Sequence, residues 1–457
     1  MKPRAGFQVA KAKQNIQMKV LKFGGTSVGK PERMQSVSQL ITADNDQKIV
    51  VLSALSGTTN SLVEISQSLS EGKKEQAKQQ IDKLENHYRT FCNDLVKQEA
   101  GRANAKAIVD EHFEFLNIIL KISFNEALNK DILAQGELLS TRLFCVYLEE
   151  AGIPAVLLPA LDFMSIDEYE EPEIPKIKIK LANLISQHKG HTVFITQGYI
   201  CRNARGEVDN LKRGGSDYSA SLIGAAIQAD EVQIWTDIDG MHNNDPRVVN
   251  KTFPIEQLSF DEAAELAYFG AKILHPASIW PAQHFNIPVK LLNTMQPEAK
   301  GTIITEMPNG NGVKAIAAKD GIIAIKIKSS RMLLAYGFLR KIFEIFEKYR
   351  TPIDMITTSE VAVSITIDNQ QYLDQILKEL QPFGTVELDY HQTIVSIVGN
   401  EVAATPSIIT KLFDAIEEIP LRMISYGGSR HNISILINGQ FKEKTLQVLN
   451  KGLFGLE

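Results

Sequence analysis

Two glycine-rich turns that carry fixed positive charge are the strongest chemical signal in this sequence. The first, KFGGTS, runs from Lys22 to Ser27, and the second, KRGGSDY, runs from Lys212 to Tyr218. In each, a β-like run leads into bare glycine backbone that can approach an anion, and then into a helix whose N-terminal amides would face that anion. Lys22 and Arg213 add a point charge and a fork that matches carboxylates. Either turn alone fits a tight strand-to-helix connection, but the two together favour phosphoryl transfer.

The first turn offers groups that a transferred phosphoryl group requires. Such a site must neutralise the γ-phosphate, hold a metal and aim a nucleophile in line. Lys22 precedes Gly24 and Gly25 and can place its ammonium on the transferred group, while Thr26 and Ser27 donate hydroxyls and begin a helix. We therefore expect this turn to contact the nucleotide phosphates.

The second turn adds a carboxylate. Asp217 follows Gly214, Gly215 and Ser216, where nearby backbone amides would keep it ionised, so that it could hold Lys22 or the metal in place. A helix N-cap role for Ser216 or Asp217 fits the local sequence equally well.

Further polar residues follow a third apolar run. The segment 234–240 ends a strand in polar groups that include Thr236 and Asp237, as at the carboxyl edge of an open sheet, where ligands bind. Arg247 follows the turn-forming pair Asp245-Pro246. Lys272 follows a glycine in FGAKILHP, where it fits either a ligand contact or a cation near a helix C-terminus.

The elements that must position these residues alternate between β-branched runs and longer helical patterns. The strand candidates are 48–55, 155–158, 192–200, 231–238 and 289–292. This alternation predicts an α/β fold with an open, mostly parallel sheet sandwiched by helices. A helix over 131–150 carries Glu137 in its first turns, and its expected inward residues are Leu138, Leu139, Leu143, Phe144, Val146 and Tyr147.

After Pro297 a ββ-α-ββ pattern occurs twice, about 70 residues apart, which indicates an internal duplication of a small α+β unit. The first copy has a strand at 322–327, a helix and strands within 353–367; the second has a strand at 393–398, a helix and a strand pair within 421–437. The helix residues expected in the two cores are Phe338, Leu339, Ile342, Phe343, Ile345 and Phe346, and Ile408, Ile409, Leu412, Phe413 and Ile416.

Bulk properties narrow the function. A chain of 457 residues should form two to four domains. The net charge of -5 and the pI of about 6.1 argue against nucleic-acid binding. No apolar run reaches the roughly 18 residues that span a bilayer, and three widely spaced cysteines are typical of reduced thiols in a cytoplasmic protein. Residues 1–17 lack an apolar signal region and are expected to be a disordered extension or the product of a start codon assigned too early; a short basic transit peptide is the alternative.

Eight segments together resemble aspartate kinases (aspartokinases) of the monofunctional, lysine-sensitive type. They are KFGGTSVG at 22–29, SALSGTTN at 53–60, QGELLST at 135–141, KRGGSDYSA at 212–220, WTDIDG at 235–240, DPRVV at 245–249, FGAKILHP at 269–276 and ITTSEVAVS at 356–364. The resemblance implies an amino-acid-kinase catalytic domain over 18–300, followed by ferredoxin-like ACT domains over 312–385 and 390–457 that interleave. It also implies the reaction of ATP with L-aspartate to give ADP and 4-phospho-L-aspartate, the first step of lysine, threonine and methionine biosynthesis.

The resemblance also assigns residues. Lys22 and Asp217 would be catalytic. The aspartate site would comprise Ser53, Thr59, Glu137, Arg213, Gly214, Gly215 and Ser216, with Arg213 clamping the α-carboxylate and Glu137 attracting the α-ammonium. The ATP site would comprise Lys22, Gly24, Gly25, Thr26, Ser27, Thr236, Asp237, His242, Arg247 and Lys272. The expected cofactor is ATP with Mg²⁺, with no residue assigned as a dedicated metal ligand. No general base is needed, because the β-carboxylate is already ionised at neutral pH.

Two segments depart from the family pattern. His242 stands where relatives usually have a tyrosine near the nucleotide, and residues 332–339 read MLLAYGFL where lysine-sensitive members resemble MLHSRGFL. The expected effector site comprises Met332, Gly337, Phe338, Leu339, Ile353, Asp354, Ser359 and Glu360. Its two carboxylates favour a cationic effector, so L-lysine is the first choice. ACT pairing would make the enzyme a homodimer or a tetramer.

Two alternative functions remain open in the sequence. The first is another acyl-phosphate-forming kinase acting on glutamate or an N-acylated amino acid; Arg213 and Glu137 together favour a substrate with both a carboxylate and a free ammonium. The second is a non-catalytic amino-acid sensor; the residues that argue against it are Lys22, Asp217, Arg247 and Lys272. The sequence leaves open the effector, dimer against tetramer, whether residues 1–17 belong to the native protein, and the biosynthetic branch. We expect no appended homoserine dehydrogenase.

Overall fold

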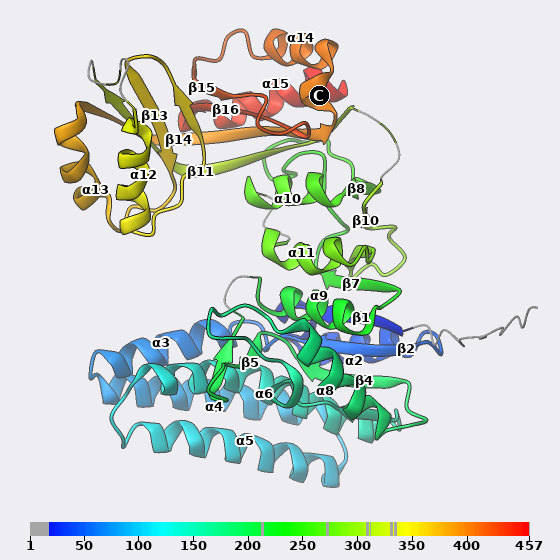
Figure 1. The fold of residues 1–457 in the computed structure, drawn as a ribbon. Coiled ribbons are helices and arrows are strands. Elements are labelled where there is room, and N and C mark those ends of the chain that lie inside the picture. Colours follow the sequence, from blue (N-terminus) through cyan, green and yellow to red (C-terminus); the bar gives the residue numbers. More distant parts are fainter. Residues whose placement is uncertain are drawn as a thin grey trace, which may run out of the picture. The chain divides into compact units, whose positions relative to one another are not determined.

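The computed structural model describes residues 18–211, 214–270, 274–307, 310, 312–329, 332 and 336–456. The expected extension 1–17 and two expected site residues, Arg213 and Lys272, lie outside this set. The chain forms two compact units, Met1–Trp235 and Thr236–Glu457 (Figure 1).

The first unit is built on parallel strands in the order β3-β4-β2-β1-β7. These are β1 (Met18–Phe23), β2 (Gln47–Leu52), β3 (Ala155–Leu157), β4 (Val193–Gln197) and β7 (Glu231–Thr236). All five residues of β4 are buried, and five of the six in β2 are buried. Such continuous burial is typical of parallel strands covered on both faces, so the expected α/β sheet is confirmed.

Helices connect and cover these strands. They are α1 (Gly25–Val28), α2 (Pro31–Ile41), α3 (Thr58–Ser70), α4 (Lys74–Leu95), α5 (Glu99–Ile119), α6 (Glu126–Glu150), α7 (Ala160–Phe163), α8 (Ile174–Ser186) and α9 (Gly215–Ile227), with a hairpin of β5 (Ile200–Arg202) and β6 (Val208–Asn210). Helices α3 to α6 pack against one another, and α9 packs on β1 (Figure 1). In α6 the expected inward residues Leu138 and Tyr147 are only half-buried, whereas the other four expected residues are buried.

The second unit begins with three strands, of which β10 (Thr302–Thr305) pairs parallel to β8 (Gln257–Ser259) and antiparallel to β9 (Val289–Asn293). Helix α10 (Phe260–Tyr268) starts with a capping box, in which the Ser259 hydroxyl accepts from the Glu262 amide and the Glu262 carboxylate accepts from the Ser259 amide. Helix α11 (Pro276–His284) begins with a proline at its first turn.

The rest of the second unit is an antiparallel sheet in the order β12-β13-β11-β14-β16-β15, which in the described residues is accompanied by four α-helices. The strands are β11 (Gly312–Lys328), β12 (Ile356–Thr358), β13 (Ala362–Ile367), β14 (Thr385–Asn400), β15 (Leu421–Ser425) and β16 (Asn432–Asn438); the helices are α12 (Phe338–Lys348), α13 (Leu373–Leu380), α14 (Pro406–Ala415) and α15 (Lys442–Phe454). The sheet has two cores, and β11 supplies both: Ile323 and Ile325 join one core, whereas Ile316 joins the other.

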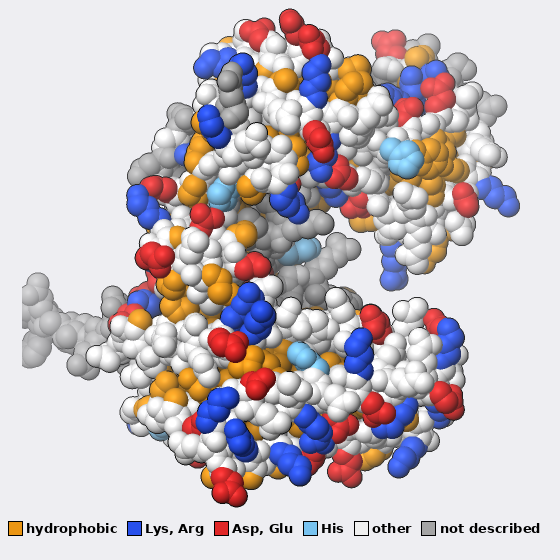
Figure 2. Space-filling model, turned by 180° about the vertical axis from the view of Figure 1, so that it is seen from behind, with side chains coloured by type: hydrophobic (Ala, Val, Ile, Leu, Met, Phe, Trp, Pro, Cys, Tyr) orange, Lys and Arg blue, Asp and Glu red, His pale blue; other side chains and the backbone are white. Residues whose placement is uncertain are grey.

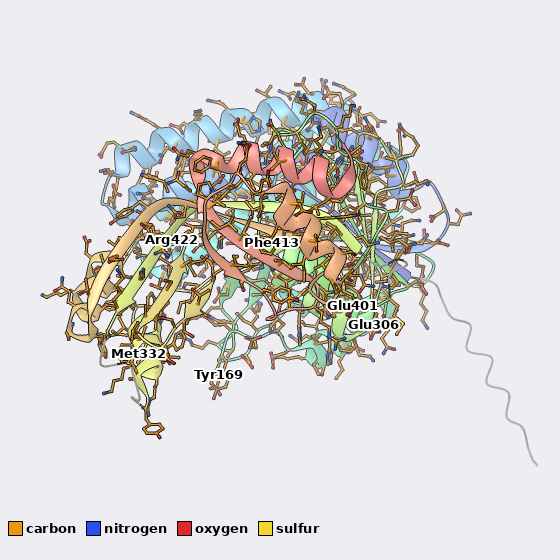
Figure 3. All side chains as sticks on the ribbon, turned by 90° about the horizontal axis from the view of Figure 1, so that it is seen from above. Tyr169, Glu306, Met332, Glu401, Phe413 and Arg422 are labelled. Carbon is orange, nitrogen blue, oxygen red and sulfur yellow. The ribbon has the colours of Figure 1, made fainter. Side chains whose placement is uncertain are left out.

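Two expected core residues are wrong. Phe343 on α12 and Phe413 on α14 are each 39% exposed, whereas Ile342 and Leu412 directly before them are fully buried. Phe413 is labelled in Figure 3. Successive residues of a helix are rotated by about 100° around its axis, so when one residue is buried against a sheet the next residue points away from the contact.

Figure 2 shows basic and acidic side chains interspersed over the face that it presents. Within the described residues, no helix combines the length and the hydropathy that a membrane span requires.

Candidate active site

The carboxyl ends of three parallel strands bring the polar turns of the first unit together. The Gly24 amide donates to the Trp235 carbonyl at 3.3 Å, and the Ser53 amide donates to the Phe23 carbonyl at 3.1 Å. These bonds place the turns after β1, β2 and β7 at one edge of the sheet, which is where ligands bind in open α/β folds.

Lys22 and Asp217 form an ion pair at this edge. The Lys22 ammonium lies 2.6 Å from Asp217 Oδ1, and the two side chains are 12% and 16% exposed. Asp217 is the third residue of α9, in the first turn of the helix, where a carboxylate interacts favourably with the N-terminal end of the helix dipole. The structure therefore joins the two expected catalytic residues, which are far apart in the sequence.

Glycines allow the backbone of these turns to lie close to neighbouring groups. A Cβ at Gly24 would lie 3.2 Å from the Lys22 ammonium, and a Cβ at Gly25 would lie 3.0 Å from the Ala54 carbonyl oxygen. Gly214, the N-cap of α9, and Gly215, its first residue, adopt φ angles of +85° and +49°. Side-chain-bearing residues rarely adopt such angles, so glycine permits this turn to end in exposed amides.

Serine hydroxyls connect the two turns. Ser53 Oγ donates to Ser216 Oγ at 2.9 Å, and Ser140 Oγ donates to the Ser53 carbonyl at 2.8 Å. Ser53 and Ser216 are thus brought together as expected for neighbours in one site. Thr59 lies exposed near the start of α3, and among the described residues it makes no hydrogen bond to the other expected aspartate ligands.

Glu137 is a buried carboxyl group beside this network. It is 4% exposed, and its Oε1 accepts from the Ala54 amide at 3.2 Å. Burial raises the pKa of Glu137 to about 7, against the lowering influence of the Ala54 amide and of the Lys22 charge. In the described part of the chain Oε2 has no hydrogen-bond partner. A buried carboxylate oxygen without a donor is costly, so this atom is suited to receive a ligand ammonium.

Sequence reasoning missed two residues that shape this site. A Cβ on Gly198 would lie 2.4 Å from the Ser216 side chain, so only glycine lets the chain after β4 pass this close to α9. Gln197, fully buried, donates through Nε2 to Thr141 Oγ1 and accepts from the Ala160 amide, each at 2.8 Å. The available signal for both was the tripeptide TQG (residues 196–198), in which the apolar strand ends.

Four of the residues that are expected to bind the nucleotide lie in the described part of the second unit. Thr236 Oγ1 donates to Asp237 Oδ1 at 3.1 Å. The Arg247 guanidinium, 80% exposed, donates to both oxygens of Asp245 at 2.9 and 2.8 Å. This arginine holds the pKa of the Asp245 carboxyl group below its ordinary value.

His242 is also fixed by hydrogen bonds. Its Nε2 lies 2.8 Å from Asp239 Oδ1, and its Nδ1 lies 2.8 Å from Thr252 Oγ1. The carboxylate can only accept, so Nε2 carries a proton and the ring is held in one orientation.

The expected effector residues form a second cluster in the same unit. Gly337 adopts a φ angle of +77° and caps α12, while Phe338, Leu339, Ile353 and Met332 pack against the core of the sheet. Met332 is labelled in Figure 3.

The polar members of this cluster differ in exposure. The Asp354 side chain is 1% exposed, and burial raises its pKa despite the Lys319 ammonium 2.7 Å away. The Ser359 amide donates to the Ala362 carbonyl at 2.8 Å, whereas Glu360 is exposed. Asp354 is therefore the expected effector ligand that is least accessible to water.

A parallel α/β sheet whose edge carries a lysine-bearing glycine turn defines a phosphotransferase site, and comparison with known proteins agrees. The model of the amino acid kinase family matches residues 17–293, and an ACT domain model matches residues 395–453. Aspartokinase 3, chloroplastic, of Arabidopsis thaliana is 36% identical over 465 residues, covering 95% of this chain and 81% of that protein.

Two solved structures extend this similarity to the fold. The crystal structure of Escherichia coli aspartokinase III in complex with aspartate and ADP (R-state) has a TM-score of 0.83 at 32% identity, covering 96% of this chain and 100% of that one. The same enzyme in complex with lysine and aspartate (T-state) has a TM-score of 0.80 at 32% identity, covering 96% and 99%. The chain belongs to the amino acid kinase family and, within it, to the aspartokinases, which confirms the resemblance carried by the motifs.

Proposed function

We propose that the residues around Lys22 transfer the γ-phosphoryl group of ATP to the β-carboxylate of L-aspartate. A carboxylate oxygen attacks the γ-phosphorus, the bond from phosphorus to the β,γ-bridging oxygen breaks, and ADP leaves. The observation that carries this proposal is the Lys22–Asp217 pair at 2.6 Å between two glycine turns. An ammonium held there before substrate arrives can stabilise charge on the transferred group without reorganisation.

The aspartate site requires partners for an ammonium and a carboxylate. Glu137 Oε2 is buried without a partner in the described residues, so we assign the substrate ammonium to it. Arg213 is assigned to the α-carboxylate, because a guanidinium can hold a carboxylate with two parallel bonds. Ser53, Ser216 and Thr59 would line the side-chain end, with Gly214 and Gly215 supplying backbone amides. N-acylated substrates lack the charged ammonium, which favours aspartate or glutamate over them.

ATP is assigned to the first glycine turn and to Thr236, Asp237, His242, Arg247 and Lys272. Arg247 already holds Asp245 through two hydrogen bonds, so a nucleotide phosphate would compete with that carboxylate for the guanidinium.

Magnesium would enter with the nucleotide. In the described residues no group of three or more His, Cys, Asp or Glu side chains could hold a metal ion. Mg²⁺ usually keeps several waters and binds through substrate phosphates plus one or two carboxylates, a role that Asp217 fits. Bound there, the ion would neutralise charge on the β- and γ-phosphates.

Regulation is assigned to the C-terminal sheet. The related Escherichia coli enzyme has been solved with lysine, and Asp354 offers a buried carboxylate for a cationic ligand. We therefore propose L-lysine as the effector. We also propose a catalytic domain over 18–300 and ACT domains over 312–385 and 390–457, through which the chain forms a homodimer or a tetramer. The proposed location is the cytoplasm.

Trapping the acyl phosphate with hydroxylamine tests the reaction. The purified chain is incubated with ATP, Mg²⁺ and hydroxylamine, and aspartate, glutamate and N-acetylglutamate are compared side by side. We expect hydroxamate from aspartate alone, and none with Lys22→Ala. A higher kcat/KM for glutamate would assign the chain to the alternative kinase class, and no hydroxamate from any substrate would reject the catalytic assignment.

A further inference from the structure

A polar cluster joins the end of α10 to the C-terminal sheet. The Lys319 ammonium lies 2.7 Å from Asp354 Oδ1 and 2.8 Å from Asp368 Oδ2, and it stands over the Tyr268 ring at 4.6 Å from the centroid. The Tyr268 hydroxyl donates to the same Asp354 Oδ1 at 2.9 Å. One carboxylate oxygen therefore holds both a helix of the catalytic part and a strand of the sheet.

The net charge of this cluster favours the binding of a further cation. Two carboxylates face a single ammonium, so the three groups carry one uncompensated negative charge. Asp354 Oδ2 is buried, and no hydrogen-bond partner for it occurs among the described residues. Since a buried charged oxygen without a donor is unfavourable, an incoming ammonium would bind at this oxygen.

The end of α10 is also pressed against the strand that carries Lys319. Gly270 has a φ of +127°, and a Cβ there would lie 2.2 Å from the Ala318 carbonyl oxygen. The Phe269 ring meets the Tyr268 ring edge-on, with centroids 4.9 Å apart. Figure 1 shows α10 next to the long strands β11 and β14, against which it packs. The end of α10 is therefore held in close contact with β11 beside Lys319.

We propose that Tyr268 couples the occupancy of the Asp354 site to nucleotide binding. An ammonium at Asp354 Oδ2 repels the Lys319 ammonium and turns the carboxylate, which weakens both contacts of Asp354 and Lys319 with Tyr268. The end of α10 then moves away from β11, and this movement alters nucleotide binding. This inference rests on the proposed function, in which Asp354 receives the effector and Lys272 contacts ATP.

Calorimetry with Tyr268→Phe tests the coupling, because this variant keeps the ring and removes only the hydroxyl. The Kd of L-lysine is measured with and without saturating ADP. Linked sites change each other's affinity by the same factor, and such factors usually lie at about 5- to 150-fold. We expect the factor by which ADP changes the Kd of L-lysine to be at least about threefold smaller in Tyr268→Phe than in wild type. The Kd of L-lysine without ADP and the uninhibited kcat should each stay within about twofold of the wild-type values. Tyr372→Phe, which removes an exposed hydroxyl that accepts from the Gln371 amide at 3.2 Å, should keep the wild-type factor.

A second measurement needs no lysine. The Kd of ADP is determined for Asp354→Asn, for Tyr268→Phe and for the double variant. We expect Asp354→Asn to change the Kd when Tyr268 is present and to have a smaller effect in Tyr268→Phe, a non-additive cycle. Additive changes would overturn the coupling role whether or not lysine binds. Failure of wild type to bind lysine, with a non-additive ADP cycle, would reject only the effector of the proposed function.

Discussion

The Lys22 ammonium and Asp217 Oδ1 lie 2.6 Å apart, in a pair that joins the end of β1 to the first turn of α9. Both side chains are largely buried, so each charge depends on the other for compensation. A bound phosphoryl group would share the ammonium with Asp217. We therefore expect the carboxylate to have a positional role, in which it keeps Lys22 aimed at the edge of the sheet before the nucleotide arrives.

Replacing either member of this pair should abolish turnover. Lys22→Ala and Asp217→Ala are each expected to lower kcat by at least about 100-fold, because one preorganised electrostatic contact contributes on the order of 3 kcal/mol in the transition state. A coupled assay of ADP release measures kcat, and thermal unfolding shows whether each variant is folded. The matched control is Lys19→Ala, which removes a lysine of the same strand that pairs with Asp44 and Asp46. Near-normal kcat in a folded Lys22 or Asp217 variant would contradict the assignment.

Aspartate binding should depend on pH through Glu137. Burial raises the pKa of Glu137 to about 7, so in the free enzyme the group is neutral below that pH and charged above it. Only the charged form attracts the substrate ammonium, so the aspartate KM should rise as pH falls below about 7, approaching tenfold per pH unit, and level off at higher pH. Initial rates from pH 6 to 8.5 measure this profile. In Glu137→Gln the aspartate KM should be high and independent of pH; a pH-independent KM in wild type would exclude Glu137 as the ammonium ligand.

The free energy of unfolding of the free enzyme should also depend on pH through Glu137, and the contribution of this group should decrease as the pH rises. The folded-state pKa of Glu137 lies above its ordinary value, so its favourable contribution is complete below pH 4.5 and is lost as pH rises through about 7. Glu137→Gln removes the buried charge, and it should therefore stabilise the enzyme relative to wild type at pH 8 more than at pH 5. Urea unfolding at the two pH values measures the difference. Equal effects of the substitution at pH 5 and pH 8 would show that Glu137 ionises normally.

The pairing of Lys22 with Asp217 could be predicted from the sequence, because two features of the local sequence point to it. Strand-turn-helix segments with consecutive glycines place polar groups at the carboxyl edge of a parallel sheet, and Lys22 and Asp217 both stand in such segments. The rest depended on packing between distant segments. Gly198 matters only because α9 passes close to it, and Tyr268 meets Asp354 across 86 residues of sequence. Apolar periodicity likewise could not show which row of α12 faces the sheet, and Phe343 was therefore placed wrongly in the core.

Arg213 should serve aspartate rather than ATP. Arg213→Ala is expected to raise the aspartate KM far more than the ATP KM, because a bidentate clamp on the α-carboxylate acts mainly in substrate binding. Arg213→Lys should restore the affinity only partly, since an ammonium lacks the planar fork. Steady-state kinetics with each substrate varied in turn provide the measurement. A raised ATP KM with an unchanged aspartate KM would assign the arginine to the nucleotide.

Gly198→Ala should disturb the aspartate side of the site through Ser216. The added Cβ would lie 2.4 Å from Ser216 Cβ and Oγ, so the start of α9 must shift. Overpacking of this kind costs about 1 to 3 kcal/mol of unfolding free energy, and the displaced serine should raise the aspartate KM. Urea unfolding and steady-state kinetics measure the two effects. Gly428→Ala is the control, because no atom lies within 4 Å of a Cβ built there. If Gly198→Ala matched this control in both measurements, the contact with Ser216 would not constrain the site.

Asp354 should determine sensitivity to lysine. Its carboxylate is 1% exposed, and Oδ2 lacks a hydrogen-bond partner in the described residues, so it offers a buried acceptor for the effector ammonium. In Asp354→Ala the lysine concentration for half-inhibition should rise by at least about tenfold, since lost hydrogen bonds to charged groups typically cost about 1.5 to 3 kcal/mol. The measurement is a lysine titration at subsaturating aspartate, expressed relative to each variant's own uninhibited rate. Asp374→Ala, which removes an exposed carboxylate from the first turn of α13, should titrate like wild type. A wild-type enzyme that is indifferent to millimolar lysine would exclude lysine as the effector, whereas equal inhibition of wild type and Asp354→Ala would place the lysine site elsewhere.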